Sequence, residues 1–315
     1  MIKFFIDLYR LILNFLFDVN DHHRRLGLFR IVLGLVLLYL AILRSFNLDF
    51  YNTNSMIPNS DSLLLFPEYY RPYLNLIFWS DRWVVFVHLI HLALLFLLII
   101  GRSHFVLMLL TWVIGQGFIQ RNYAVLFGAD VISNLFLFYL CFTDCQSKYV
   151  VFPVFFRLNR INFSFLNSFR NDLSRIFFRL MQLQIMIIYA YTGFEKLKGN
   201  SWWEGTALWT VLVNPQFSWI DFSFLKSVPA VFALGTFIAI VFEVYFPVMV
   251  AFKKTRKWWL LLGFLFHLQI GFLLGLFSFS WVMCSTYILF FDKTCFDFIE
   301  KKMSIFNRSN SQSKV

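Results

Sequence analysis

Apolar stretches of roughly 15–25 residues recur along the whole chain, and short polar segments separate them. An α-helix of that length crosses the hydrocarbon core of a bilayer, because it rises about 1.5 Å per residue. We therefore predict an all-α, polytopic transmembrane helical bundle of about eight spans. The predicted spans are Leu26–Leu43, Trp83–Ile100, His104–Ile119, Ala124–Phe142, Ile176–Thr192, Val228–Phe252, Lys257–Leu274 and Phe277–Phe291.

The composition supports this interpretation, since 59% of the residues are hydrophobic and 14% are charged. Soluble domains are about 45–50% apolar and about 25% charged. The sequence divides into residues 1–25, an amphipathic interfacial helix with a basic inner segment, residues 26–292, the transmembrane domain, and residues 293–315, a cytoplasmic polar tail. The first segment has apolar residues at helical spacing but also charges, which is typical of a helix lying in the membrane interface.

The distribution of Lys and Arg predicts how the chain is oriented. If the N-terminus is cytoplasmic, 20 of the 28 basic residues fall on inner segments and 7 on outer segments, with Arg30 inside the first span. Cytoplasmic loops of membrane proteins carry such an excess of basic residues. We expect a multi-pass protein of the cell membrane with both termini in the cytoplasm. The net charge of +11 then reflects orientation and contact with anionic lipid in the bilayer, and we expect no nucleic-acid partner.

Two long outer segments are rich in aromatic residues. They run over residues 44–82 and residues 193–227, and the second holds Trp202, Trp203 and Trp209. Aromatic side chains at this density suit the belt where a membrane meets water. We expect both segments to fold back onto the outer ends of the spans.

One group of polar residues lies in the outer half of the predicted bundle. His88 and His91 are three residues apart and share a helix face. Asp130 lies in the first turns of the fourth span, and Glu195 and Lys196 close the fifth span at the outer surface. Ionisable groups are costly in hydrocarbon, so those near or within a span are functional candidates.

A second group lies deeper. Glu243 and His267 stand about 13 Å and about 15 Å from the inner ends of consecutive antiparallel spans. Because their depths match, we predict that these two side chains contact each other. Arg30 begins nearer the inner end, and its long side chain could extend to join them.

Structural roles are open alternatives for all of these residues. Arg30 could extend to the cytoplasmic interface instead, and Glu243 with His267 could be a structural pair between helices. Histidines at such positions are more often hydrogen-bonded structural residues than metal ligands. Lys196 could serve as the cap of a helix C-terminus.

The four cysteines form no CxxC motif, and most lie near the predicted cytoplasmic face, where thiols stay reduced. We expect Cys141 and Cys145 to be small buried residues, and we expect neither a disulfide nor a metal site.

Three motifs occur in order along the chain. They are RLGLFRIVLG (residues 25–34), QIMIIYAYTGFEKLKGNSWWEGTAL (residues 184–208) and FLFHLQIGFLLGLFSFSWVM (residues 264–283). Together they resemble the HTTM domain, which is the membrane domain shared with vitamin K-dependent γ-carboxylases, and the likeness covers roughly residues 20–295. The same pattern resembles the bacterial sporulation-delaying-protein B family, which helps to mature a secreted peptide toxin.

The resemblance to the carboxylases implies roles for two residues. In those enzymes a membrane lysine of the G-x-x-K-L motif deprotonates reduced vitamin K, and the lysine at the matching position here is Lys196. Oxygenation of the cofactor then yields a stronger base that prepares a substrate glutamate for addition of CO2. A poorly solvated lysine gives up its proton readily, which suits this role. His267 matches the histidine of the third motif.

Two hypotheses about function follow. In the first, the chain is a membrane-embedded modifying enzyme that acts at the outer face on a secreted peptide or a lipophilic substrate. Its catalytic candidates would be Lys196, His267, Glu243 and Asp130, with Asp130 or Glu195 tuning the lysine. The residues themselves identify no cofactor, and the resemblance implies a reduced quinone. In the second hypothesis, the chain is a non-catalytic maturation, export or immunity factor for a secreted peptide.

Overall fold

The computed structural model describes residues 21–301 apart from residues 54, 56, 65, 103, 123–126, 151–163, 217–219 and 299. Within these residues the secondary structure is entirely helical. Five of the described helices are long and apolar enough to cross a membrane, and three shorter apolar helices accompany them. The all-α prediction is confirmed in this part of the chain, and the number of eight spans stays a prediction. Most of the interfacial helix predicted at the N-terminus and the tail beyond residue 301 lie outside the described residues.

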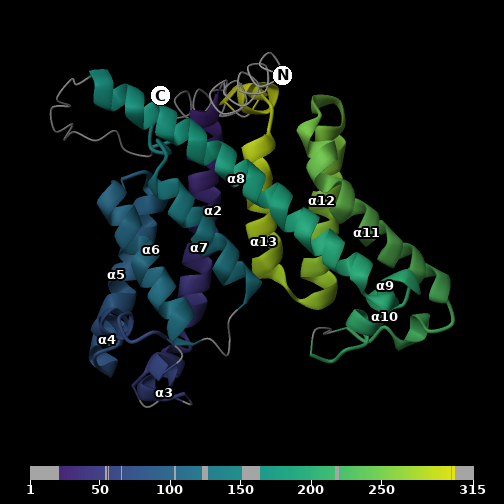
Figure 1. Ribbon diagram of the computed structural model, residues 1–315, viewed down its shortest axis with the longest axis horizontal. Coiled ribbons are helices and arrows are strands. Elements are labelled where there is room, and N and C mark those ends of the chain that lie inside the picture. Colours follow the sequence, from purple (N-terminus) through teal and green to yellow (C-terminus); the bar gives the residue numbers. More distant parts are fainter. Residues whose placement is uncertain are drawn as a thin grey trace, which may run out of the picture.

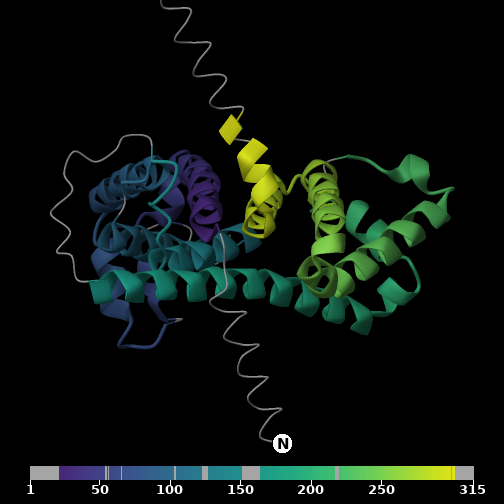
Figure 2. The same ribbon diagram turned by 90° about the horizontal axis from the view of Figure 1, so that it is seen from above.

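Four helices form one half of the molecule. They are α2 (His22–Ser45), α5 (Asp81–Ile100), α6 (Phe105–Arg121) and α7 (Gly128–Cys141), and they pack side by side in both Figure 1 and Figure 2. Helix α2 is central, because it packs against α5 and α7 within the group and against α13 beyond it. Its buried face is apolar and meets the main hydrophobic core through Leu26, Phe29, Leu33 and Leu37.

Two antiparallel helices form the other half. They are α11 (Pro229–Ala251) and α12 (Lys253–Leu274), and α13 (Phe277–Thr286), continued by the short helix η4 (Tyr287–Phe290), stands between the halves. Helix α13 packs against α12 on one side and against α2 and α7 on the other. One hydrophobic core therefore runs through both halves of the molecule.

Helix α8 (Ser164–Lys198) has 35 residues and crosses one side of the whole bundle (Figures 1 and 2). The sequence predicted a shorter span over Ile176–Thr192. The helix begins earlier because its first turns carry polar groups that do not end a helix, and the Ser174 hydroxyl accepts a hydrogen bond from the backbone N–H of Asp144 at 3.0 Å. At about 1.5 Å per residue, α8 is about 52 Å long, which lets it contact both α7 and α11.

The segment before α5 is organised by Arg121, at the end of α6. This segment contains η1 (Leu48–Tyr51), α3 (Asn59–Leu64) and α4 (Arg71–Ile77). The buried Arg121 guanidinium donates hydrogen bonds to the carbonyl oxygens of Asn52 at 2.6 Å and Ile57 at 2.9 Å. The segment is thereby connected to the end of α6.

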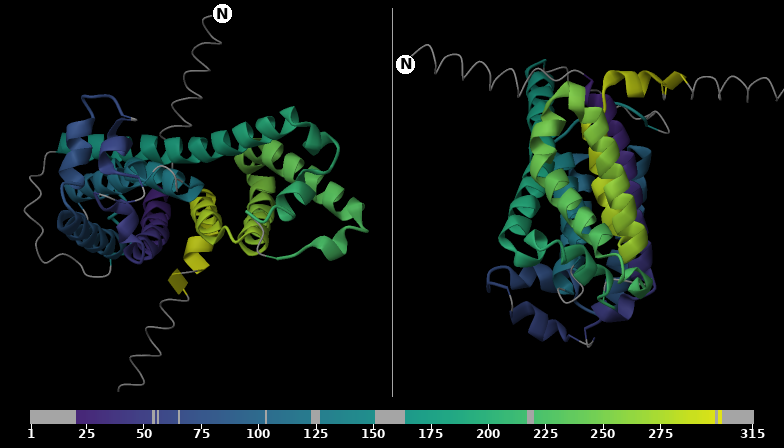
Figure 3. Two further views of the ribbon diagram at one scale, coloured as in Figure 1. Left: turned by 90° about the horizontal axis from the view of Figure 1, so that it is seen from below. Right: turned by 90° about the vertical axis from the view of Figure 1, so that its right-hand side faces the viewer.

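The segment after α8 also forms short helices, namely α9 (Asn200–Trp203), α10 (Ala207–Leu212) and η3 (Ser223–Leu225). Helix α10 packs on α11, where the backbone N–H of Leu208 donates to the hydroxyl of Thr236 at 3.1 Å. Figure 3 shows the short helices of both segments at the same end of the bundle. This arrangement agrees with the expectation that the two aromatic segments cover the same ends of the spans.

Candidate functional site

The candidate site lies where the last turns of α8 meet α11. Gly193 is buried against α11, and a Cβ at this position would lie 2.9 Å from the backbone nitrogen of Val244. The two helix backbones can approach this closely because glycine has no side chain. Lys196 follows three residues later and therefore lies on the same face of α8. The crossing of α8 and α11 therefore explains both the glycine and the lysine of the G-x-x-K motif, because the glycine permits the close approach and the lysine faces the same helix.

Lys196 pairs with Glu243 at this crossing. The Lys196 Nζ donates to Oε2 of Glu243 at 2.6 Å, and the exposed fractions of the two side chains are 21% and 8%. Trp202 of α9 lies beside the amine, with its ring centroid 5.2 Å from Nζ, within the range of a cation–π contact. The lysine charge is therefore balanced by a carboxylate and an aromatic face in a place that is largely shielded from solvent.

Lys196 lies in the last turn of α8, in agreement with the prediction that it closes this helix, but its partner lies well inside another helix. Glu243 lies 14 residues after the first residue of α11 and 8 residues before the last, so Lys196 reaches the middle of that helix. Glu195 points elsewhere, because it is exposed and forms an ion pair with Lys198 at 2.6 Å. The acidic partner of Lys196 is therefore Glu243, and the hypothesis that Glu195 tunes the lysine is corrected.

His267 belongs to a neighbouring buried network. Its Nε2 shares a hydrogen bond with the Tyr189 hydroxyl at 2.5 Å, and the Tyr189 hydroxyl also hydrogen-bonds to the Tyr287 hydroxyl. Among the described residues no hydrogen bond or ion pair joins His267 to Glu243. The predicted contact is replaced by two separate pairings. The Tyr189 ring packs against Phe242, the residue before Glu243, with ring centroids 5.5 Å apart, so the network adjoins the Lys196 pair.

Asp130 lies in the other half of the molecule, on α7. The guanidinium of Arg44 interacts electrostatically with Asp130 and with both His88 and His91 of α5. Phe118 lies at the centre of this cluster, with the Arg44 Cζ 4.7 Å from its ring centroid. Since α5 and α11 belong to opposite halves (Figure 1), this cluster does not supply a direct partner for Lys196.

Arg30 does not join the Glu243 region either. It is fully buried, and its Nη1 donates to the carbonyl oxygens of Leu98 and Ile99, the second at 2.9 Å, while Nη2 donates to Tyr149 at 2.8 Å. These carbonyls include the end of α5, where Gly101 has a φ of +83°. Arg30 therefore caps a helix C-terminus, as a cation there is expected to do. The idea that it extends toward Glu243 and His267 is wrong.

The sequence did not reveal the Lys196–Glu243 pair. One usable signal was Gly193, because a glycine inside an apolar helix marks a close approach of another backbone. The sequence could not show that the meeting point is the middle of α11, since this depends on how α8 is inclined across the bundle.

Comparison with known proteins gives one similarity. The chain is similar to "Sporulation-delaying protein SdpB" of Bacillus subtilis (strain 168), with 25% identity over 116 residues. The aligned part is 35% of this chain and 36% of that protein, so the similarity spans about a third of each. No protein-family model and no solved structure matches the chain. The similarity supports a relation to the sporulation-delaying-protein B family, while the likeness to the HTTM domain rests on the three motifs alone.

Proposed function

We propose that the chain is a membrane-embedded modifying enzyme in which Lys196 acts as a base. The observation that carries this proposal is the hydrogen bond of 2.6 Å between Lys196 and Glu243 at a largely shielded place. An ionisable pair inside a membrane domain is costly to bury, which makes Lys196 and Glu243 candidates for a functional role.

The pair can supply a neutral amine without releasing charge into the membrane. Transfer of one proton along the Nζ–H···Oε2 hydrogen bond leaves a neutral amine beside a neutral carboxylic acid. This form avoids two buried charges, whose desolvation is the main cost of a buried ion pair. The amine can then accept a proton from a substrate, which leaves the substrate as an anion next to the lysine ammonium. Trp202 stabilises that ammonium through its ring face.

The other candidate residues have supporting parts in this proposal. His267, Tyr189 and Tyr287 form a hydrogen-bonded network that fixes the packing of α8, α12 and η4 beside the pair. We assign His267 a positioning role, because its hydrogen bond goes to Tyr189 and not to Glu243. Asp130 has no direct role at Lys196 in this proposal, since it lies beside Arg44 in the other half of the bundle.

A reduced quinone fits the chemistry of this place. The Lys196 side chain is 21% exposed, so its amine, once neutral, is accessible to accept a proton from a ring hydroxyl. Trp202 offers an aromatic face beside the amine. When bound, such a cofactor would supply the oxidisable ring that the carboxylase reaction uses. The side chains of this chain would hold and deprotonate it, and the substrate would be a secreted peptide or another lipophilic molecule at the outer face.

A second function is favoured by the similarity to sporulation-delaying protein SdpB. In this alternative the chain is a non-catalytic maturation, export or immunity factor for a secreted peptide. Lys196 and Glu243 would then connect α8 to α11 and carry no chemistry. This alternative requires the pair as a contact but not the lysine as a proton acceptor.

Mass spectrometry of secreted peptides tests the enzyme proposal. Cells producing the wild type are compared with cells producing Lys196→Arg, Lys196→Met or the control Lys198→Met. Lys198 is the matched control because it is exposed and pairs with Glu195 at the surface. We expect a mass change on a secreted peptide in the wild type and in the control, and its loss in both Lys196 variants, since a guanidinium stays protonated. An unchanged peptide pattern in Lys196→Arg at normal membrane expression would contradict a base and favour the contact role.

A further inference from the structure

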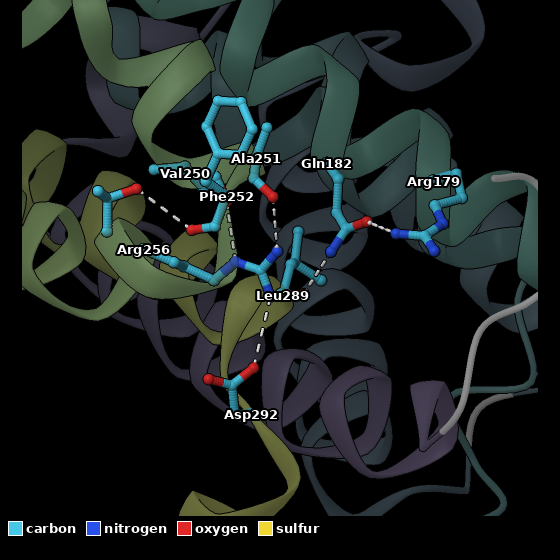
Figure 4. Close-up of polar contacts among 9 residues, drawn as sticks. Arg179, Gln182, Val250, Ala251, Phe252, Arg256, Leu289 and Asp292 are labelled. Carbon is cyan, nitrogen blue, oxygen red and sulfur yellow. Dashed lines mark hydrogen bonds and ion pairs between the residues drawn. The ribbon is translucent and has the colours of Figure 1, made fainter.

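Arginines on three helices lie around η4, at the end of the bundle that carries the N-terminus of α2. They are Arg25 on α2, Arg179 on α8 and Arg256 on α12. Figure 4 shows Arg179 joined to Gln182, whose side-chain amide donates to the Leu289 carbonyl oxygen at 2.7 Å. These contacts hold α8 against η4 at this end of the bundle.

Arg256 is held in place by backbone carbonyls. Its Nε donates to Val250 at 2.8 Å and its Nη2 to Ala251 at 3.1 Å, which caps the end of α11 (Figure 4). Its Nη1 lies 3.4 Å from Oδ1 of Asp292. The Arg256 side chain is 17% exposed and Asp292 is 49% exposed, so this ion pair opens to the surroundings of the protein.

Arg25 lies on α2, which packs against η4 next to Asp292, and in the described part of the chain it lacks comparable partners. Its guanidinium stands over the Phe178 ring, with Cζ 5.7 Å from the centroid. In the part of the chain that the structure describes, its buried Nε has no hydrogen-bond partner. Arg256 repels it electrostatically, while Asp292 and Asp21 attract it. A guanidinium that is poorly solvated, repelled by a second one and short of acceptors is stabilised by an additional anion.

The surroundings of Arg25 and Arg256 add positive charge and apolar surface. Exposed lysines near this end include Lys253 and Lys293. Phe252 and Trp258 flank Arg256 in sequence and are both exposed. A ligand with an anionic head and an apolar body would match both features.

The distribution of basic residues predicts that the starts of α2 and α12 lie at the cytoplasmic level of the lipid headgroups. Arg25 is three residues after the start of α2, and Arg256 is three residues after the start of α12. Each therefore lies about 4.5 Å inside its helix end. Basic pockets between spans at the cytoplasmic side are suited to bind acidic lipid headgroups.

We propose that Arg25 and Arg256 bind the phosphate of an anionic phospholipid, whose acyl chains lie against the apolar face of α11 and α12. The lipid phosphate accepts hydrogen bonds from the Arg25 guanidinium and compensates the repulsion between the two arginines. The lipid thereby links the half of the molecule that contains α2 to the half that contains α12. This site is separate from Lys196 and does not depend on the proposed chemistry.

Native mass spectrometry of the full chain, purified in detergent, tests the site. The protein is titrated with phosphatidylglycerol, with phosphatidylcholine and with inorganic phosphate. Variants are Arg25→Gln and the control Lys254→Gln, which removes an exposed charge of the same sign at the same end of the bundle. Arg25→Gln is preferred to a change at Arg256, because Arg256 caps α11 and its loss could prevent folding.

We expect the wild type to retain phosphatidylglycerol in preference to phosphatidylcholine. Arg25→Gln should weaken phosphatidylglycerol binding by about tenfold, as loss of a hydrogen bond to a charged group implies, and Lys254→Gln should leave it nearly unchanged. Equal binding of both lipids, or undiminished phosphatidylglycerol binding in Arg25→Gln, would overturn the proposal. Full competition by inorganic phosphate would show that free phosphate, and not a lipid, is the ligand, and would overturn it as well.

Discussion

The amine of Lys196 lies 2.6 Å from Oε2 of Glu243, and this contact joins the last turns of α8 to the middle of α11. The pair forms because Gly193 lets the two helix backbones meet one turn earlier along α8. Glycine at the crossing and lysine after it are therefore parts of one arrangement. Changes at either residue should affect the other.

The first prediction concerns Gly193→Ala. The new Cβ would lie 2.9 Å from the backbone nitrogen of Val244, so α8 and α11 must move apart. We expect a loss of about 1–3 kcal/mol in unfolding free energy, as for overpacking elsewhere. Thermal unfolding in detergent measures it. Gly128→Ala is the control, because its Cβ would meet Phe279 at an ordinary 3.5 Å. Equal stability of the two variants would show that the close approach at Gly193 does not matter.

The sequence was sufficient to locate most of the helices, and the reason is physical. Each apolar stretch must bury its backbone polar groups in helical hydrogen bonds, so its length sets the helix. The predicted Val228–Phe252 and the observed Pro229–Ala251 differ by one residue at each end. The exception is α8, whose first turns alternate apolar and polar residues and therefore form no continuous apolar stretch.

The pairing of polar side chains could not be predicted in the same way. Depth along a span was used to match Glu243 with His267, but depth says nothing about the direction in which each side chain points. Tyr189 forms the hydrogen bond to His267. Lys196 reaches Glu243 because α8 is inclined across the bundle. Helix inclination depends on packing against neighbours, which a single sequence does not show.

The second prediction concerns Arg30→Leu. This change removes the charged donor from the carbonyls of Leu98, Ile99 and Tyr149 inside the protein. Hydrogen bonds from charged groups each contribute about 1.5–3 kcal/mol, so we expect a loss of at least about 3 kcal/mol. Arg30→Lys should recover part of it, since an ammonium lacks the fork of donors. Thermal unfolding with the exposed Lys254→Gln as control tests this, and a normal melting temperature for Arg30→Leu would refute the capping role.

The third prediction concerns pH. Burial and then the hydrogen bond to Glu300 raise the pKa of Tyr149 to about 12 from its ordinary value of 10.0. Because the folded pKa is the higher one, the stabilisation is present below pH 10 and is lost as the pH rises toward 12. Tyr149 is only partly buried, so we expect only about 1 kcal/mol after allowing for solvent screening. Unfolding of the wild type and Tyr149→Phe should diverge below pH 10 and converge above it. Parallel profiles over this range would contradict the shift.

The fourth prediction concerns orientation in the membrane. The excess of basic residues on one set of segments, 20 against 7, predicts that both termini are cytoplasmic. Reporter fusions after Ser313 and at Asn54 should therefore report opposite sides of the membrane. The same side for both fusions would exclude the arrangement of eight spans.

The last prediction separates the contact between Lys196 and Glu243 from the chemistry of the lysine. Lys196→Glu alone places two carboxylates side by side, and Glu243→Lys alone places two amines there. Each single change should cost about 3–5 kcal/mol, the penalty of breaking a buried ion pair. The double variant with both changes restores opposite charges across the same helix crossing. We expect its unfolding free energy to recover most of that loss, as a double-mutant cycle reports.

Activity should not recover in the exchanged pair if Lys196 is a base. The amine would then project from the middle of α11, where the exposed fraction of the side chain is 8% instead of 21%, and Trp202 would face a carboxylate. The peptide modification detected by mass spectrometry should therefore remain absent although the protein is stable. If the exchanged variant modified the peptide as the wild type does, the position of the amine would be irrelevant. The pair would then act only as a connection between α8 and α11, and the maturation-factor alternative would be preferred.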